Sequence, residues 1–409
     1  MSSEEPRAAA PGWVETIDCT LRDGEQAPGV AFTIAEKLEI ATALSDAGVD
    51  VLDAGFPGSG AAEVETLQEL HRQGLKAKIG ATARPFPGDV AAADAAHADE
   101  VFLFMPTSDI RIEKTLGTTR SRAADFLVAG AENVVSCGMG LNVVFEDATR
   151  ARPEFLLETT ERIAGAVPVR RVIIADTVGC ATPDSMSALV RRFLGAFAGS
   201  LVVCPHCHND FGLATANTLQ AVLAGCTSLT CTVNGLGERA GNADLAEVAA
   251  ALGHLHGIGH GIDLTALPAL AELVERRSGV HTSFTKPVTG LNVFRHESGV
   301  HVDAMLKSTD SYEFLPSDAI GRRTEFVLGK HSGRALVHTL LGELKPGPAD
   351  EDTVTQVLAA VKGRYAHADK FAHDRLHEQR RRFFAEHLSG LDRDELKRLA
   401  GPAAQPVGD

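Results

Sequence analysis

The sequence predicts an α/β fold, a TIM (β/α)8 barrel followed by a C-terminal linker or lid segment and a small helical region. Over the first 260 residues, short apolar segments typical of strands alternate with amphipathic segments typical of helices. Eight such units fit into about 250 residues, the usual size of this barrel. The sequence has no Gly-x-Gly-x-x-Gly that opens a helix, a motif typical of open dinucleotide-binding sheets. A closed barrel is therefore the favoured architecture.

Each predicted strand is a short apolar run bounded by polar or turn-forming residues. The eight strands are Val14–Leu21, Val49–Phe56, Ala77–Ala83, Glu100–Met105, Leu141–Phe145, Arg171–Asp176, Leu201–Pro205 and Ser228–Val233. The clearest helices between them are Thr33–Ala47, Pro153–Ala166, Pro183–Phe197, Leu213–Ala224 and Ala243–Leu255. Thr33 with Glu36 three residues later forms a capping-box pattern, and two of these helices begin with proline.

The alternation ends after the barrel domain, which we place at residues 13–262. Residues 263–345 form the linker or lid segment, with a helix at Leu267–Arg277 and then irregular structure over 278–333. Residues 346–400 are predicted to be a helical region. The tail, Gly401–Asp409, is expected to be disordered.

Composition excludes several classes of protein. A net charge of −15 on 409 residues argues against non-specific nucleic-acid binding. The polar start, Met1–Gly12, precedes no signal-peptide core, and no apolar run is long enough for a membrane span. The seven cysteines are scattered through predicted core strands, which predicts a reduced, cytoplasmic protein. Cys204 and Cys207 match C-x-x-C, but they end a strand rather than begin a helix, so we interpret them as buried thiols.

Two strand ends carry a candidate metal site. Arg22 and Asp23 follow the first strand, and His206 and His208 follow the seventh. Residues two apart on a strand face the same side, so the two histidines point together. One Asp and two His form a ligand set for a divalent metal with open positions for substrate. With an arginine beside it to stabilise an oxyanion, the set indicates a metal-dependent enzyme that acts on a carbonyl or carboxylate compound.

Polar residues also follow the other strands, where TIM barrels place their sites. They are Arg84, Glu146 and Asp147, Asp176 and Thr177, and, after the eighth strand, Glu238, Arg239 and Asn242. Their convergence on one rim predicts an active site there.

Five motifs of this rim resemble a known family. They are LRDGEQ, FEDATR, ADTVG, HCHNDFGLATAN and NGLGERAGNA. The chain resembles the DRE-TIM metallolyase superfamily over roughly residues 13–340, and within it the homocitrate, isopropylmalate and citramalate synthases. The resemblance implies an acyltransferase that condenses acetyl-CoA with a 2-oxo acid and then hydrolyses the thioester.

The resemblance also implies roles for the rim residues. The matching positions are Asp23, His206, His208 and Asn242 for the metal, Arg22 and Glu146 for catalysis, and Gln26 and Thr177 for the oxo acid. In this interpretation the metal, one of Mn, Mg, Co or Zn, chelates the acceptor as a Lewis acid, and the arginine stabilises the alkoxide. The glutamate positions a water or the acetyl group.

A base for the acetyl methyl group is implied by a later segment. In similar synthases a His and a Tyr from this region reach the active site of the neighbouring subunit. The matching positions are His301 and Tyr312. A homodimer with exchanged C-terminal segments is therefore expected.

The acceptor and the direction of the reaction remain open in the sequence. The loop after strand eight, Gly237–Asn242, has no cysteine, which favours a synthase over a retro-Claisen lyase. The stretches FRHESGVHVDAMLK, SYEF and VLGKHSGR most resemble homocitrate synthases of the nitrogenase-cofactor type, which use 2-oxoglutarate. Phosphonopyruvate, as in phosphonomethylmalate synthases, is the first alternative, followed by the acceptors of isopropylmalate and citramalate synthases.

The contact for a second anionic group of the acceptor is also open. Asn142 stands where the lysine-pathway homocitrate synthases have an arginine, so Arg84 or Arg111 is expected to bind a distal carboxylate or phosphonate. A non-catalytic metal-binding barrel is the alternative outside enzymes.

Overall fold

The computed structural model describes residues 10–197, 199–344, 349–366, 371–391 and 393–400. The predicted disordered tail, 401–409, lies outside these ranges. The chain divides into two compact units. The first contains Met1–Ala27, Ala31–Thr282 and Pro287–Thr289, and the second contains Pro28–Val30, Ser283–Lys286 and Gly290–Asp409.

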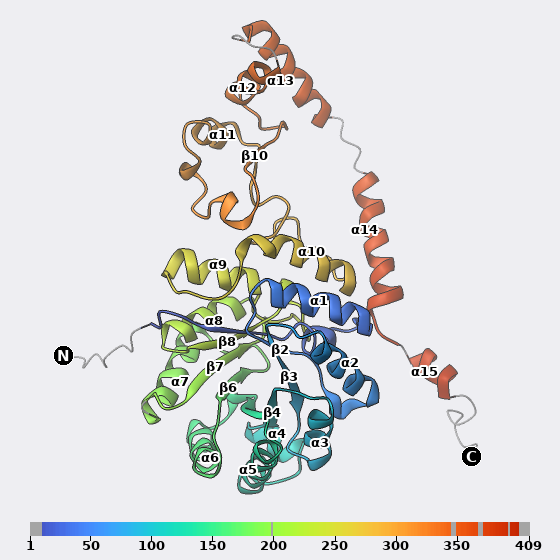
Figure 1. The fold of residues 1–409 in the computed structure, drawn as a ribbon. Coiled ribbons are helices and arrows are strands. Elements are labelled where there is room, and N and C mark those ends of the chain that lie inside the picture. The colour runs from blue at the N-terminus through green and yellow to red at the C-terminus, as the bar shows by residue number, and fades with distance from the viewer. Residues whose placement is uncertain (1–9, 198, 345–348, 367–370, 392, 401–409) are drawn as a thin grey trace, which may run out of the picture. The chain divides into compact units, whose positions relative to one another are not determined.

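The first unit is the predicted TIM barrel (Figure 1). Its parallel strands are β1 (Glu15–Asp18), β2 (Val51–Asp53), β3 (Lys78–Ala83), β4 (Glu100–Pro106), β5 (Gly140–Glu146), β6 (Arg171–Asp176), β7 (Val202–Cys207) and β8 (Ser228–Cys231). They pair in the order β7-β6-β5-β4-β3-β2-β1-β8. A hydrogen bond between His206 and Thr230 joins the two ends of this order, β7 and β8, so the barrel is nearly closed.

All eight predicted strands are present, but β1, β2 and β8 are shorter than the prediction. β1 ends at Asp18, where the chain enters a compact turn. The backbone N–H groups of Arg22, Asp23 and Gly24 all donate to the carbonyl of Cys19. Arg22 and Asp23 are therefore fixed by a turn rather than by a strand.

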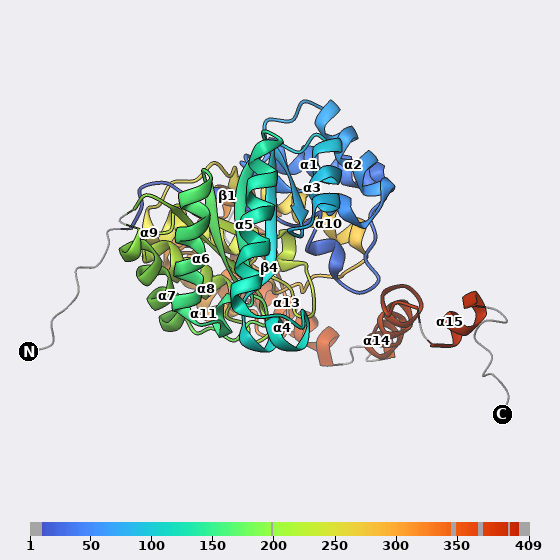
Figure 2. The same ribbon diagram turned by 90° about the horizontal axis from the view of Figure 1, so that it is seen from below.

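Helices surround the strands, as the views from the side and from below show (Figures 1 and 2). They are α1 (Ile34–Asp46), α2 (Ala61–Arg72), α3 (Pro87–Ala95), α4 (Asp109–Lys114), α5 (Arg120–Ser136), α6 (Pro153–Ala166), α7 (Pro183–Ala196), α8 (Ala214–Leu223), α9 (Leu245–His256) and α10 (Leu267–Ser278). The capping box of α1 is confirmed: the Thr33 side chain accepts from Glu36 N, and Glu36 accepts from Thr33 N.

No bounds were predicted from the sequence for α2, α3, α4 and α5. α2 follows Gly60 and α3 follows Phe86, and neither residue caps its helix with a side chain. A side-chain N-cap is therefore missing from the sequence at both positions, and α3 keeps only the proline at its start, Pro87.

The barrel interior is layered. At the amino ends of the strands, Arg171 on β6 binds Glu15, Glu100 and Asn142. Above this layer lies a buried apolar cluster of Ile17, Cys19, Val51, Phe102, Ile173 and Cys204. The cluster separates the lower charges from the polar residues at the carboxyl ends.

The second unit carries short strands and helices. They are β9 (Arg295–His296), β10 (Glu325–Phe326), α11 (Gly299–Met305), α12 (Arg334–Leu344), α13 (Glu351–Ala366), α14 (Phe371–Phe383) and α15 (Arg393–Ala400), and β9 pairs with β10 in parallel. The segment 278–333, predicted to be irregular, thus contains one short helix and one strand pair. Among the described residues, no helix has the length and apolar character to cross a membrane.

Candidate active site

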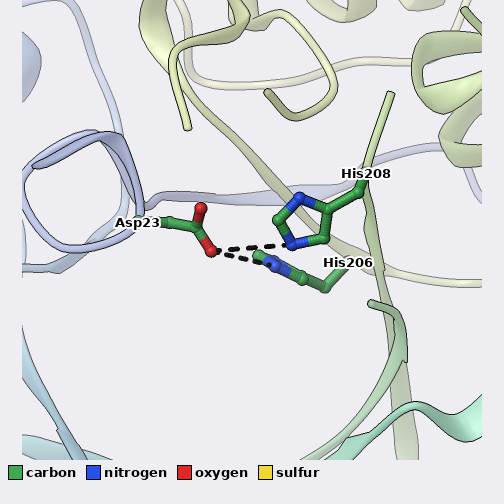
Figure 3. A group of neighbouring side chains, drawn as sticks. All are labelled: Asp23, His206 and His208. Atoms are coloured by element: carbon green, nitrogen blue, oxygen red, sulfur yellow. Dashed lines mark ion pairs between the residues drawn. The ribbon is translucent and has the colours of Figure 1, made fainter. Parts of the chain in front are cut away.

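Asp23, His206 and His208 meet at the carboxyl end of the barrel (Figure 3). Asp23 comes from the turn after β1, His206 lies on β7, and His208 follows that strand by one residue. The Asp23 Oδ2 atom is 3.4 Å from His206 Nε2 and 3.8 Å from His208 Nε2. All three side chains are buried, and one ligand atom of each lies within 4.8 Å of the others.

The hydrogen bonds of His206 show which ring nitrogen is free. Its Nδ1 is 2.9 Å from Thr230 Oγ1, and that hydroxyl is 3.1 Å from the carbonyl of Pro205. A carbonyl only accepts, so the hydroxyl donates to Pro205 and accepts from His206 Nδ1–H. In the neutral imidazole, Nε2 therefore carries a lone pair and faces a carboxylate oxygen. A proton or a metal ion is needed between these two acceptors.

The protonation states of His208 and Asp23 also favour a metal ion at this site. The pKa of His208 is lowered to about 4, chiefly by burial and then by the neighbouring His206, so this ring is neutral at pH 7. Burial alone would raise the pKa of Asp23, but Arg22 and the two histidines hold it well below its usual range. A neutral imidazole and an ionised carboxylate are the forms that bind metals. The residues present therefore fit a divalent ion.

Asn242, the predicted further ligand, lies against this cluster. Its Nδ2 atom donates to Asp23 Oδ1 at 3.0 Å, and its buried Oδ1 has no hydrogen-bond partner among the described residues. Gly237 allows this approach, because a Cβ there would lie 2.1 Å from Asn242 Nδ2. An amide oxygen without a partner beside the cluster is available as a further ligand.

Arg22 is held by two carboxylates. Its Nε donates to Asp53 Oδ2 at 2.7 Å, and its Nη1 donates to Asp23 Oδ2 at 2.8 Å. Burial would lower the pKa of Arg22, but Asp53 and Asp23 outweigh burial and raise it above its ordinary value. Gln26 Oε1 lies at 3.5 Å from the same Nη1. The rim thus presents a fixed cation next to the candidate metal ligands.

Glu146 and Thr177 line the same cavity. Burial raises the pKa of Glu146, and the ion pair with Arg111 opposes that rise. Thr177 Oγ1 accepts from Asp147 N at 2.8 Å, which leaves its hydroxyl proton free to be donated to a ligand.

The cavity has a volume of about 250 Å³ and two kinds of wall. Its polar wall includes Arg22, Asp23, Gln26, Glu146, Thr177, His206 and His208. Its apolar wall consists of Cys19, Phe56, Phe102, Phe104, Val144, Ile173 and Ala175. One chamber therefore joins the candidate metal site to an apolar space.

Both arginines predicted to bind a distal anion pair with carboxylates of the chain, although the buried Nε of Arg111 has no hydrogen-bond partner among the described residues. Arg84 binds Asp89 through two hydrogen bonds of 2.7 and 3.0 Å, and Arg111 pairs with Glu146. Neither is among the residues that line the cavity. Asn142 lies in the lowest layer of the barrel, where it binds Arg171 and Glu100.

His301 and Tyr312 belong to the second unit. Their rings stack with centroids 4.1 Å apart, and both residues are exposed. They pair with each other, and their predicted role at the cavity stays a prediction.

The interpretation of the C-x-x-C motif is confirmed. Cys204 and Cys207 are free, buried thiols on β7, and burial raises the pKa of each to about 12. Such thiols are protonated at neutral pH and unreactive.

Sequence reasoning missed two kinds of site residue. Asp53, which anchors Arg22, lies inside the predicted strand Val49–Phe56 and ends the observed β2, and a carboxylate within an apolar run was available as a signal. Phe56, Phe102 and Phe104 carry no such signal, because an aromatic residue in a strand usually belongs to the core.

Fold and site together define a TIM-barrel protein with a candidate metal site at the carboxyl end of its strands. A family model described as HMGL-like matches residues 13–274, and one described as homocitrate synthase post-HMGL domain-like matches residues 288–370. The chain belongs to the HMGL-like family, which confirms the resemblance seen in its motifs.

Similar proteins with names narrow the class of enzyme. A putative (R)-citramalate synthase of Methanopyrus kandleri is 39% identical over 87% of this chain and 69% of its own length. A probable 2-isopropylmalate synthase of Ignicoccus hospitalis is 41% identical over 86% of this chain and 88% of its own length. These relatives confirm the predicted enzyme class, an acyltransferase of the synthase type.

Solved structures share the fold. An HMG-CoA lyase from Acenitobacter baumannii, in complex with coenzyme A and 3-methylmalate, has a TM-score of 0.59 at 20% identity. The match covers 66% of this chain and 93% of the lyase chain. At this identity the likeness supports the barrel alone.

Proposed function

We propose that the protein catalyses a metal-dependent condensation of acetyl-CoA with a 2-oxo acid, followed by hydrolysis of the thioester. The product is a 2-hydroxy-2-alkyl dicarboxylate. The observation that carries the proposal is the buried group of Asp23, His206 and His208, with His206 Nε2 3.4 Å from Asp23 Oδ2 and with Arg22 beside it. The names of the citramalate and isopropylmalate synthases among the relatives support the same chemistry.

The metal would be held by Asp23, His206 and His208, with Asn242 as a further ligand. A divalent ion there supplies Lewis-acid polarisation of the ketone and a positive charge for the adjacent carboxylate. Mn, Mg, Co and Zn are the candidate ions.

The protein groups supply the remaining chemistry. The guanidinium of Arg22, positioned by Asp53, stabilises the alkoxide that forms when the ketone is attacked. Thr177 donates its hydroxyl proton to the acceptor, and Gln26 contributes an amide nearby. Glu146, with its pKa raised by burial, positions the water or the acetyl group.

The acetyl methyl group still requires a base. Among the residues that the structure describes, the only histidines that line the cavity are the two proposed metal ligands. We assign the base role to His301, supported by Tyr312, acting from the neighbouring subunit of a homodimer. Mixing inactive Arg22→Ala with inactive His301→Ala subunits is expected to restore partial activity, and a failure to complement would contradict shared sites.

The retro-Claisen lyase is the second candidate. The shared fold of the HMG-CoA lyases supports it, but the loop Gly237–Asn242 lacks the cysteine expected of those enzymes. A lyase would cleave a hydroxyacyl-CoA and would release no free CoA from acetyl-CoA.

The test is release of free thiol from acetyl-CoA in the presence of 2-oxo acids and each of the four metals. At least one acid is expected to release CoA, and chelation is expected to stop the reaction. If no acid releases CoA with any metal, the synthase assignment fails, and cleavage of hydroxymethylglutaryl-CoA then distinguishes the lyase from a non-catalytic barrel.

A further inference from the structure

The apolar wall of the cavity is a rigid surface. Phe102 on β4 lies over Gly80 on β3, where a Cβ would be only 2.4 Å from the phenylalanine Cε2. Phe56 packs edge-to-face on Phe104, with ring centroids 6.1 Å apart. A glycine thus makes room for one ring and a ring pair fixes the others, so the wall has a defined shape.

The arginines that line the cavity already bind other groups of the protein. Within the described part of the chain, two arginines line it, Arg22 and Arg239. Arg22 binds Asp53 and Asp23, while Arg239 holds Asp210 through two hydrogen bonds and donates to the carbonyl of Thr177. Arg239 therefore anchors a loop. Outside the lining residues, the Arg84 guanidinium lies 5.4 Å from the Phe56 ring centroid, where two hydrogen bonds to Asp89 hold it.

The reacting end of any 2-oxo acid would occupy the polar wall, since its ketone and carboxylate need the metal and Arg22. Its side chain would then extend toward Phe56, Phe102 and Phe104. A second carboxylate or phosphonate in that space would lose its hydration without gaining a partner, which is costly. An apolar side chain would gain from burial against the rings.

We propose that this site takes a 2-oxo acid with an uncharged, apolar side chain and that Phe56, Phe102 and Phe104 select it. This inference rests on the proposed synthase function and narrows its substrate class. It replaces the sequence-based preference for a dianionic acceptor, because Arg84 and Arg111 pair with Asp89 and Glu146 instead of lining the cavity.

Acceptor ranking tests the proposal directly. The metal-loaded full-length enzyme is assayed by thiol release with pyruvate, 2-oxobutyrate and 2-oxoisovalerate against 2-oxoglutarate and phosphonopyruvate. The best uncharged acid is expected to exceed both dianions in kcat/KM by about 100-fold or more, since discrimination by an unpaired polar group is large. A higher kcat/KM for either dianion overturns the proposal while leaving the synthase function intact. No release with any acid overturns the function itself.

Variants of the apolar wall test whether its residues select the acceptor. Phe104→Ala is expected to shift the ranking toward longer apolar side chains, and Val144→Arg is expected to raise the relative kcat/KM for 2-oxoglutarate by at least about tenfold. Phe193→Leu is the matched control, because Phe193 is buried on α7 and does not line the cavity. Its ranking should equal that of the wild type. A ranking unchanged by both wall variants, with melting curves that show folded protein, would contradict selection by this wall. If a variant does not fold, the wild-type ranking decides.

Discussion

Buried charged groups are paired differently at the two ends of the barrel. At the amino end, Arg171 is 1% exposed and is bound by Glu100, Glu15 and Asn142. At the carboxyl end, His206 Nε2 faces the Asp23 carboxylate, and the buried Oδ1 of Asn242 has no partner among the described residues. An ion-paired cluster, in which Arg170 and Arg171 each face one Glu100 oxygen, stabilises the closed barrel. A cluster with an unpartnered ligand atom beside an Asp and two His is prepared for a ligand.

The largest effect is expected from the carboxyl-end cluster. His206→Gln removes a proposed metal ligand and should lower kcat/KM by about 10³-fold, more than the 10- to 100-fold typical of outer-shell partners. Bound metal, measured by elemental analysis, should fall in parallel. The melting temperature in chelated buffer should change little. Wild-type activity of the variant in chelated buffer would contradict the ligand assignment.

The amino-end cluster should show the opposite pattern. Arg171→Met leaves Glu100 buried without its main partner and is expected to cost about 3–5 kcal/mol of unfolding free energy. The kcat of the folded fraction should stay at the wild-type value. Denaturant unfolding and active-site-normalised assays measure the two quantities.

A double variant controls for this effect. Adding Glu100→Gln to Arg171→Met should recover part of the lost stability, because the unpaired charge is removed. A loss of kcat without a loss of stability would mean that the lower cluster takes part in catalysis.

Asp18 carries a buried carboxyl on β1 that belongs to neither cluster. Burial raises its pKa from 3.8 to about 7, against opposing hydrogen bonds from Thr20. The folded chain therefore binds more protons than the unfolded chain between about pH 4 and pH 7, so this group makes stability fall as pH rises through that window. Asp18→Asn should remove this contribution. The fall in unfolding free energy between about pH 4 and pH 7 should then become smaller by up to a few kcal/mol. An unchanged slope in denaturant unfolding across the window would exclude a raised pKa.

The smallest effect is expected from the pair of Arg111 and Glu146. Arg111 lowers a pKa that burial raises, so Arg111→Ala should raise the pKa of Glu146 further. If Glu146 acts as a carboxylate, the acid limb of the kcat/KM profile moves to higher pH while its maximum stays in place. Arg84→Ala is the control, since its partner is Asp89. The same shift in both variants would exclude a specific effect on Glu146.

The sequence predicted what depends on short-range pattern. Alternating apolar segments placed all eight strands, and two-residue spacing brought His206 and His208 together beside Asp23. It did not predict the pairing of Arg84 with Asp89 or of Arg111 with Glu146, because a cation at a strand end does not reveal which carboxylate reaches it. The aromatic wall was also missed, since its inward direction depends on how the barrel closes.

Metal titration of chelator-stripped enzyme, followed by thiol release with acetyl-CoA and an uncharged 2-oxo acid, tests the metal site most directly. One divalent ion per chain is expected to bind and to restore activity in proportion to occupancy. His206→Gln under the same conditions should show neither binding nor recovery. Full activity of the stripped wild type, or binding that the variant retains, would contradict a catalytic metal held by Asp23, His206 and His208.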